Sequence, residues 1–283
     1  QSGPLLLRLG TEKQKSRYLP GICRGELAFC IGLSEPDSGS DLASLRSRAD
    51  KIEGGWRLNG RKIWTTYAKQ SDYMIGLFRT GMGEEFARHK GLSQFVIDLS
   101  LPGVEIRPIR DLTGEAHFNE IVFENVELPD DALVGVENQG WAQVNAELAF
   151  ERSGPDRYLS AFPLLPVSID QLPEKDRLSS RRIGESYAQL AVLREMSLSI
   201  LNQLEEGKTP LQEAAVTKLI GTELEQSTPD LVRELLDSPA IVQRGEIHSE
   251  MLAYLTQAVP SFSLRGGTNE IMRGIIAKGL GLR

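Results

Sequence analysis

The chain has 283 residues, of which 40% are hydrophobic and 25% are charged, and its formal net charge is −7. These proportions are ordinary for a globular protein, and the negative charge disfavours a general nucleic-acid binder. No stretch approaches the roughly 20 apolar residues of a membrane-spanning helix, and no secretory signal is visible. Two cysteines and three scattered histidines fit neither a disulfide framework nor a metal site, so we expect a cytoplasmic protein without a metal.

Residues 1–22 are predicted to be the end of a helical region. The segment Leu5–Leu9 is rich in leucine and is followed by Gly10 and then by a charged stretch. Leu19-Pro20 predicts a break in the helix. We therefore expect one helix that ends at the glycine and a short second helix that ends at the proline. Because the chain opens with Gln inside a helix-like stretch, we also expect an upstream segment to be missing.

Residues 23–137 are predicted to form a β-rich domain. Leu27–Leu33 is typical of a buried strand, and Asn59-Gly60 between alternating residues predicts a hairpin turn. Many short strands with turn residues between them predict a barrel or a sandwich, and we expect a barrel. The further strands that we expect are Tyr73–Phe78, Gln94–Asp98, Val104–Ile109 and Glu120–Phe123.

Residues 138–283 change to a helical period. The fold class is therefore predicted to be α+β, with a β-barrel middle domain followed by an all-helical carboxy-terminal bundle that mediates oligomerisation. The predicted helices are Trp141–Arg152, Arg177–Glu205, Pro210–Glu225, Thr228–Leu236, Glu246–Gln257 and Asn269–Leu280.

Two loops of the β region could hold a polar ring system or a phosphate. Ser34–Asp41 combines small residues with hydroxyl donors directly after the buried strand. Trp64-Thr65-Thr66 sets an aromatic face beside two hydroxyl groups. Taken alone, each pattern is more often an ordinary polar turn or a core tryptophan beside two strand threonines.

One carboxylate and one turn stand out in the helical region. Val144, Leu148 and Glu151 follow at i, i+4 and i+7, so Glu151 lies on the apolar stripe. A carboxylate there is costly unless it is functional or paired with an arginine, and the pattern favours neither alternative. Arg265–Glu270 combines two glycines with a candidate N-cap, Thr268, and such a turn can approach an anion but is usually only a cap.

Together and in this order, these motifs resemble the acyl-CoA dehydrogenase family over essentially the whole chain. The resemblance implies an FAD-dependent enzyme that oxidises an acyl-CoA thioester to the trans-2-enoyl-CoA in fatty acid or sterol side-chain degradation. It also implies electron-transfer flavoprotein as acceptor, a tetramer, and a helical domain before the point where this chain begins. The matching segments are Gly10–Lys15, Arg17–Pro20, Leu33–Pro36, Gly39–Asp41, Asn59–Thr66, Phe118–Glu120, Val126–Pro129, Gly135, Gly140-Trp141 and Gly267–Arg273.

The resemblance also implies roles for individual residues. Ser34 and Thr66 would hydrogen-bond the edge of the flavin ring, and Trp64 would pack against it. Thr268 and Glu270 would contact the FAD of a neighbouring subunit. The full cofactor-binding set that the resemblance implies is Ile31, Leu33, Ser34, Ser40, Trp64, Thr65, Thr66, Thr268 and Glu270, and the substrate-binding set is Ser40, Arg152 and Gly267.

The catalytic base differs from that of many family members. They carry a glutamate immediately before the Gly-Thr of the closing motif, where this chain has Gly266, which cannot abstract a proton. A minority place the glutamate on the helix that follows the β domain. Glu151, followed by Arg152, matches that position and is also the carboxylate on the apolar stripe. We therefore predict that Glu151 is the base.

Two family segments that contact FAD are not evident in this chain. The Gln-x-x-Gly-Gly segment would fall within Leu236–Gly245, and Arg181–Gly184 is at best a remnant of the Arg-x-Phe-Gly segment. This departure favours an oligomer with a second, homologous subunit over a homo-oligomer. It also leaves two alternatives open, a non-catalytic partner subunit of a heteromeric acyl-CoA dehydrogenase and a flavin-dependent monooxygenase on the same fold.

Overall fold

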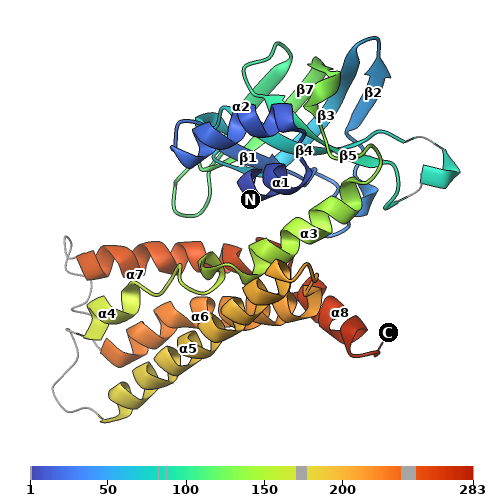
Figure 1. Ribbon diagram of the computed structural model, residues 1–283. Coiled ribbons are helices and arrows are strands. Elements are labelled where there is room, and N and C mark those ends of the chain that lie inside the picture. Colours follow the sequence, from blue (N-terminus) through green and yellow to red (C-terminus); the bar gives the residue numbers. More distant parts are fainter. Residues whose placement is uncertain (1, 82, 87, 170–176, 237–246, 283) are drawn as a thin grey trace. The chain divides into compact units, whose positions relative to one another are not determined.

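The computed structural model describes residues 2–81, 83–86, 88–169, 177–236 and 247–282 (Figure 1). It divides into two compact units, Gln1–Glu147 and Leu148–Arg283. The first unit contains the described strands and the second is helical, which confirms the α+β class. None of the described helices is both long and apolar enough to cross a membrane.

Two helices, α1 (Ser2–Leu9) and α2 (Glu12–Cys23), open the first unit. The predicted break at Leu19-Pro20 is wrong, because α2 continues through the proline to its end at Cys23. A proline removes one backbone hydrogen bond, and in the last turn of a helix this loss is small beside packing. Leu19 and Ile22 pack with Tyr18 against the sheet, and this burial keeps the last turn helical.

One sheet of eight strands forms the body of the first unit. Its path runs β6-β7-β3-β2-β4-β5-β8, and β1 pairs in parallel with β4 off this path. The predicted barrel is therefore wrong, because the sheet does not close. The end strands β6 and β8 do not pair, and β8 has only two residues. The strands are β1 (Phe29–Gly32), β2 (Arg48–Ile52), β3 (Gly55–Thr66), β4 (Tyr73–Arg79), β5 (Leu92–Asp98), β6 (Val104–Ile109), β7 (Phe118–Pro129) and β8 (Leu133–Val134).

The predicted hairpin turn at Asn59-Gly60 is also wrong. Ile52 pairs with Gly55, so the turn between β2 and β3 lies at the two residues between them, and Asn59 and Gly60 lie inside β3. Gly60 has φ 142°, and a Cβ built on it would lie 2.2 Å from the Ser47 hydroxyl oxygen. Glycine is required there by close packing at a register shift between β3 and β7, and not by a turn.

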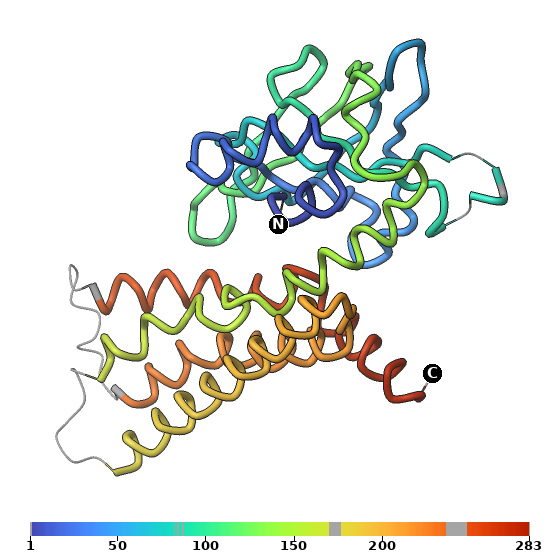
Figure 2. Tube along the Cα trace, in the orientation of Figure 1, coloured from blue at the N-terminus to red at the C-terminus, as the bar shows by residue number. Residues whose placement is uncertain are grey.

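The second unit is built around the long helix α6 (Figure 2). It contacts α4, α5, α7 and α8, and its neighbour α5 runs alongside it in the opposite direction. Helix α3 leads into this unit from the first. The helices are α3 (Gly140–Ser153), α4 (Leu164–Ile169), α5 (Arg177–Glu205), α6 (Leu211–Leu236), α7 (Ile247–Ala258) and α8 (Asn269–Gly279). Short 3-10 helices span Leu42–Ser44, Ala68–Gln70, Glu84–Phe86, Asp130–Ala132, Pro155–Arg157 and Val259–Ser263.

Two helices that the sequence predicted separately form one continuous helix, α6. The expected join before Pro229 is absent, since α6 runs through this proline without a break. Pro229 itself is buried, and Val232, one turn later, lies in the apolar core of the unit. Proline at 229 lacks the amide that would donate to the Glu225 carbonyl, and the packing of this turn in the core outweighs that loss.

Candidate functional site

In the first unit, a buried ion pair fixes the loop that follows β1 to strand β3. The Lys62 side chain is fully buried, and its Nζ donates to Glu35 Oε1 at 2.8 Å. Burial lowers the pKa of Lys62 to about 8, and the neighbouring Glu35 carboxylate acts in the opposite direction. The Ile63 amide also donates to the Ser34 carbonyl at 2.9 Å. The two loops that the sequence singles out are therefore neighbours.

Trp64 has an unusual backbone for a strand residue. Its φ is 61°, and the register between β3 and β7 shifts between Lys62 and Thr65. A positive φ is strained for a bulky aromatic residue, and such strain gathers at functional sites. The indole is 57% exposed, and the Phe118 ring meets it edge-on with ring centroids 5.9 Å apart. The bulge thus presents an aromatic face outward at the end of β3.

Hydroxyl groups flank this tryptophan. The Thr66 side chain is exposed, whereas Thr65 is buried and its carbonyl accepts from Asn119 Nδ2 at 3.0 Å. Among the described residues, the Thr66 and Ser34 hydroxyls make no hydrogen bond, and Thr65 Oγ1 is buried without a partner. The Ser34 and Thr66 hydroxyls, beside an exposed indole, can bind a planar polar ligand.

The other residues predicted in these loops are less closely joined. Ile31 and Leu33 are half-buried, and Ser40 is exposed. Within the described ranges, no hydrogen bond connects Ser40 with the Trp64 loop. The loop is instead closed on itself, because the Ser38 hydroxyl meets the Ser44 hydroxyl at 2.6 Å.

In the second unit, Glu151 is held by an arginine. It lies in the last turn of α3, and the turn of 3-10 helix Pro155–Arg157 brings Arg157 back toward it. Arg157 Nη2 lies 2.5 Å from Glu151 Oε1, and Arg157 Nε donates to the Glu151 carbonyl at 3.2 Å. The Glu151 side chain is only 16% exposed, and the Arg157 side chain only 7%. The Glu151 carboxylate is therefore paired with an arginine, and that arginine is Arg157.

The Glu151 carboxylate lies directly beside Gly266. A Cβ built on Gly266 would be 3.1 Å from Glu151 Oε1. Arg152 is buried, and its Nε donates to the Gly266 carbonyl at 2.9 Å. A Cβ on Gly267 would be 3.3 Å from Arg152 Nη2. Residues 151 and 266 are the two positions at which the family resemblance places the base. The structure thus brings them together with Arg152 and Gly267, two of the predicted substrate-binding residues.

Helix α8 begins directly after these glycines. Thr268 is its N-cap, as predicted, and its hydroxyl accepts from the Ile271 amide at 3.3 Å. Glu270 is exposed in the first turn, where hydrogen bonds from its own backbone and then from Thr268 lower the pKa of its carboxyl.

Further charged residues surround this site, and sequence reasoning missed them. Lys218 Nζ is buried and donates to the Ser263 carbonyl and to Asn269 Oδ1, both at 3.3 Å. Burial, followed by the positive charges of Arg157 and Arg265, lowers the pKa of Lys218 to about 8. Lys218 shares the buried stripe of α6 with Glu225, seven residues later. The stripe test that singled out Glu151 would have found both residues.

Glu225 forms a second ion pair beside the first. Its Oε2 accepts from Arg265 Nη2 at 2.8 Å, and its Oε1 accepts from the Ser160 amide at 2.7 Å. Burial raises the pKa of Glu225, and Arg265 acts against this rise. The site therefore contains four cations, Arg152, Arg157, Lys218 and Arg265, and the buried carboxylates of Glu151 and Glu225, and the exposed Asp156 carboxylate lies 3.4 Å from Arg157 Nε.

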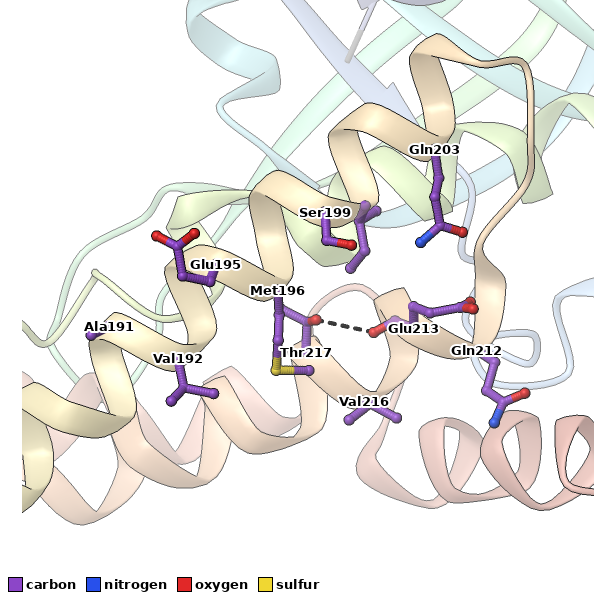
Figure 3. A pocket seen from close by; sticks show the side chains of 11 residues that line it. Ala191, Val192, Glu195, Met196, Ser199, Gln203, Gln212, Glu213, Val216 and Thr217 are labelled. Carbon is purple, nitrogen blue, oxygen red and sulfur yellow. Dashed lines mark hydrogen bonds between the residues drawn. The ribbon is translucent and has the colours of Figure 1, made fainter.

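A groove of about 660 Å³ lies elsewhere in this unit, between α5 and α6 (Figure 3). Its walls are mainly apolar and include Ala191, Val192 and Met196 from α5 and Val216 from α6. No predicted site residue lines it.

The two segments that depart from the family pattern lie in other places. Arg181 and Arg182 are on α5, where they form ion pairs with Glu185 and Glu234. Residues 237–245 lie outside the described part of the chain, so the stretch expected for the Gln-x-x-Gly-Gly segment is not placed.

Comparisons with known proteins agree with this architecture. Residues 30–126 match the acyl-CoA dehydrogenase middle domain, and residues 171–281 match the acyl-CoA dehydrogenase C-terminal domain. Acyl-CoA dehydrogenase IpdE1 of Mycobacterium tuberculosis is 33% identical over 98% of this chain and 72% of the relative. Acyl-CoA dehydrogenase FadE34 of the same organism is also 33% identical, and this chain spans 38% of its length.

Solved structures share the whole fold of the chain. The Tcur3481-Tcur3483 steroid ACAD has a TM-score of 0.86 at 27% identity and covers 100% of this chain and 75% of its own. The ChsE4-ChsE5 complex from Mycobacterium tuberculosis has a TM-score of 0.86 at 27% identity, with coverages of 100% and 76%. The FAD complex of PigA has the same fold, with a TM-score of 0.87 at 24% identity. The chain therefore belongs to the acyl-CoA dehydrogenase family, and it matches the middle and carboxy-terminal domains of that family.

Proposed function

We propose that this chain carries out FAD-dependent oxidation of an acyl-CoA thioester to the trans-2-enoyl-CoA, with Glu151 as the base. The observation that carries the proposal is the 3.1 Å distance between Glu151 Oε1 and the place of a Cβ at residue 266. A carboxylate from either position reaches the same small region. Glycine at 266 therefore does not remove the base from this site, because α3 supplies it.

The residues of the first unit fit a flavin. The strained backbone of Trp64 turns its indole outward, where it can pack on a ring, and the Ser34 and Thr66 hydroxyls are free to donate to the ring edge. Ile31, Leu33, Ser40 and Thr65 complete the proposed set from this unit, and Thr268 and Glu270 would contact the FAD of a neighbouring subunit. When bound, FAD supplies the acceptor for the hydride that leaves the β-carbon.

The chain's own residues then have three tasks. Glu151 takes the proton from the α-carbon, a step for which a positioned general base contributes about 10²–10⁴-fold. Arg152 holds the Gly266 carbonyl and so fixes the turn against which the thioester lies. Ser40 and Gly267 are the further proposed contacts to the acyl-CoA. Burial of Glu151 limits the access of water to the base.

The partners belong to the same proposal. The heteromeric ChsE4-ChsE5 complex, and the absence of the family's diphosphate segment at Arg181–Gly184, favour an oligomer with a homologous subunit. The similarity to the Tcur3481-Tcur3483 steroid ACAD favours an acyl group derived from a sterol. Electron-transfer flavoprotein is the proposed electron acceptor.

The deciding experiment is an anaerobic absorbance titration of the purified protein, with and without its homologous subunit, by a panel of acyl-CoAs. We expect the bound flavin to bleach, and the Glu151→Gln variant to lose at least about 10²-fold in the rate of bleaching, because it cannot accept the proton. Glu206→Gln is the matched control, since this exposed glutamate forms only a surface ion pair with Lys208.

Other outcomes distinguish the alternatives. If E151Q bleached as fast as the wild type, Glu151 would not be the base, and a partner-only subunit would be the better assignment. A flavin that no acyl-CoA reduces, but that reacts rapidly with oxygen once reduced, would support a monooxygenase. A colourless chain that turns yellow only with its homologue would show that the flavin site is shared.

A further inference from the structure

We infer that Arg157 is a positioning residue that fixes the Glu151 carboxylate for proton transfer. This inference deepens the proposed function and rests on it. Arg157 grips the glutamate at two points, its carboxylate at 2.5 Å through Nη2 and its backbone carbonyl at 3.2 Å through Nε. A grip on both ends of one residue restrains all the side-chain torsions between them.

The need for such a grip follows from the place of Glu151. A glutamate has three rotatable side-chain bonds, and it stands here in the last turn of α3, opposite a glycine that has no side chain to pack against it. Without a partner the carboxylate would sample several rotamers. A displacement of about 1 Å at a reacting group can cost about 10²-fold in rate.

Arg157 is itself held in place. Its amide donates to the Gly154 carbonyl at 3.0 Å, and only 7% of its side chain is exposed. Its carbonyl presses against α6 so closely that a Cβ on Gly221 would lie 2.5 Å from that oxygen. The glycine of α6 therefore permits the close approach that aims Arg157 at Glu151.

No other cation of the cluster occupies this role in the described part of the chain. Arg152 donates to Gly266, and Lys218 donates to Ser263 and Asn269. Arg157 is the one whose nitrogen reaches the Glu151 carboxylate.

The grip also assigns the two oxygens of the carboxylate. Oε1 accepts from Arg157, whereas Oε2 accepts no hydrogen bond from any residue that the structure describes. Oε2 is therefore the atom that receives the α-proton, and Oε1 stays bound to the guanidinium throughout.

The test compares Arg157→Gln with Arg157→Lys, which keeps the charge but loses the two-point grip. In the acyl-CoA titration we expect R157Q to lower the maximal rate of flavin bleaching by about 10²-fold, with half-saturation by acyl-CoA unchanged. R157K should recover part of this loss.

Arg265→Gln is the matched control, since it also removes a buried arginine of the cluster, but one that binds Glu225. Thermal denaturation of all variants monitors folding. We expect R265Q to lose stability as R157Q does, while the ¹³C resonance of the Glu151 carboxyl keeps its wild-type chemical shift. A resonance that moves equally in both variants would overturn the inference, because the effect would then be a general loss of positive charge.

A readout independent of turnover separates the two claims. The carboxyl resonance of Glu151 is assigned by its disappearance in E151Q, and its ¹³C chemical shift is compared among the variants at one pH without acyl-CoA. If the wild type bleaches and E151Q does not, but R157Q behaves as the wild type, the positioning role is refuted and the proposed function stands. If the wild type never bleaches, the proposed function fails. The carboxyl chemical shifts then decide the contact, and equal shifts in R157Q and the wild type would refute it.

Discussion

Lys218 shows how one residue can link the charge of the site to pH. It is buried, and its pKa is lowered to about 8 from an ordinary value of 10.5 by burial and then by Arg157, Arg265 and Arg152. Below about pH 8, Lys218 is protonated in both the folded and the unfolded chain, and folding bears the full cost of the buried charge. Between pH 8 and 10.5 only the unfolded chain keeps the proton, so this lysine makes stability rise with pH.

Replacement of Lys218 by methionine should remove this rise. The difference in Tm between the wild type and K218M should change in favour of the wild type by at least about 2–4 °C from pH 7.5 to 10, the shift that 1 kcal/mol produces in a protein of this size. Calorimetry across this range measures it, and Lys208→Met, at an exposed lysine, is the control. Parallel curves for K218M and the wild type would show that Lys218 does not titrate between these values.

At the scale of the element, β3 shows what the sequence could and could not specify. The alternation of residues on both sides of Asn59-Gly60 indicated β structure, but the dipeptide itself predicted a hairpin turn, because only neighbours in sequence were considered. Ser47 decides against the turn, and it belongs to another part of the chain. Likewise, Glu151 was found from its apolar stripe and from the family motif. Its partner Arg157 was not, because the turn of 3-10 helix that brings the two together leaves no periodic signal.

Substitution of Gly60 by alanine tests this account of β3. The new Cβ would meet both the side chain and the Cα of Ser47, the latter at 2.6 Å, and φ would stay at 142°. We expect the free energy of unfolding to fall by about 2–4 kcal/mol. Urea denaturation followed by tryptophan fluorescence measures this fall. Gly54→Ala is the control, since Gly54 has φ 75° but open space around it, and its cost should be only about 1 kcal/mol. Equal losses would mean that contact with Ser47 is unimportant.

At the scale of the whole molecule, the apolar surface of the helical unit favours association. Val192 on α5 is 59% exposed beside the groove of Figure 3, and Leu198, Leu201 and Ile220 are exposed on the same two helices. A chain in solution rarely leaves so many large apolar side chains open unless another surface covers them. We expect a homologous subunit to pack there.

Val192→Asp should therefore weaken the assembly. Light scattering after gel filtration should show a smaller mass for V192D than for the wild type at the same concentration, because a charge is costly in an apolar interface. Val136→Asp is a matched control, as Val136 is 66% exposed in the other unit. If the two variants had equal mass distributions, the groove face would not be the subunit interface.

Gly266 has a consequence for how this site can evolve. Its backbone has φ 66°, a conformation that costs most side chains about 1 kcal/mol, and any side chain there would meet Glu151 at 3.1 Å. On the proposed assignment of Glu151 as the base, a lineage that moved the base from the helix to this turn would first place two carboxylates in one space, or would first lose Glu151 and with it the activity. Selection would act against either order of substitutions. We therefore expect the position of the base to persist among descendants of this chain even where the substrate changes.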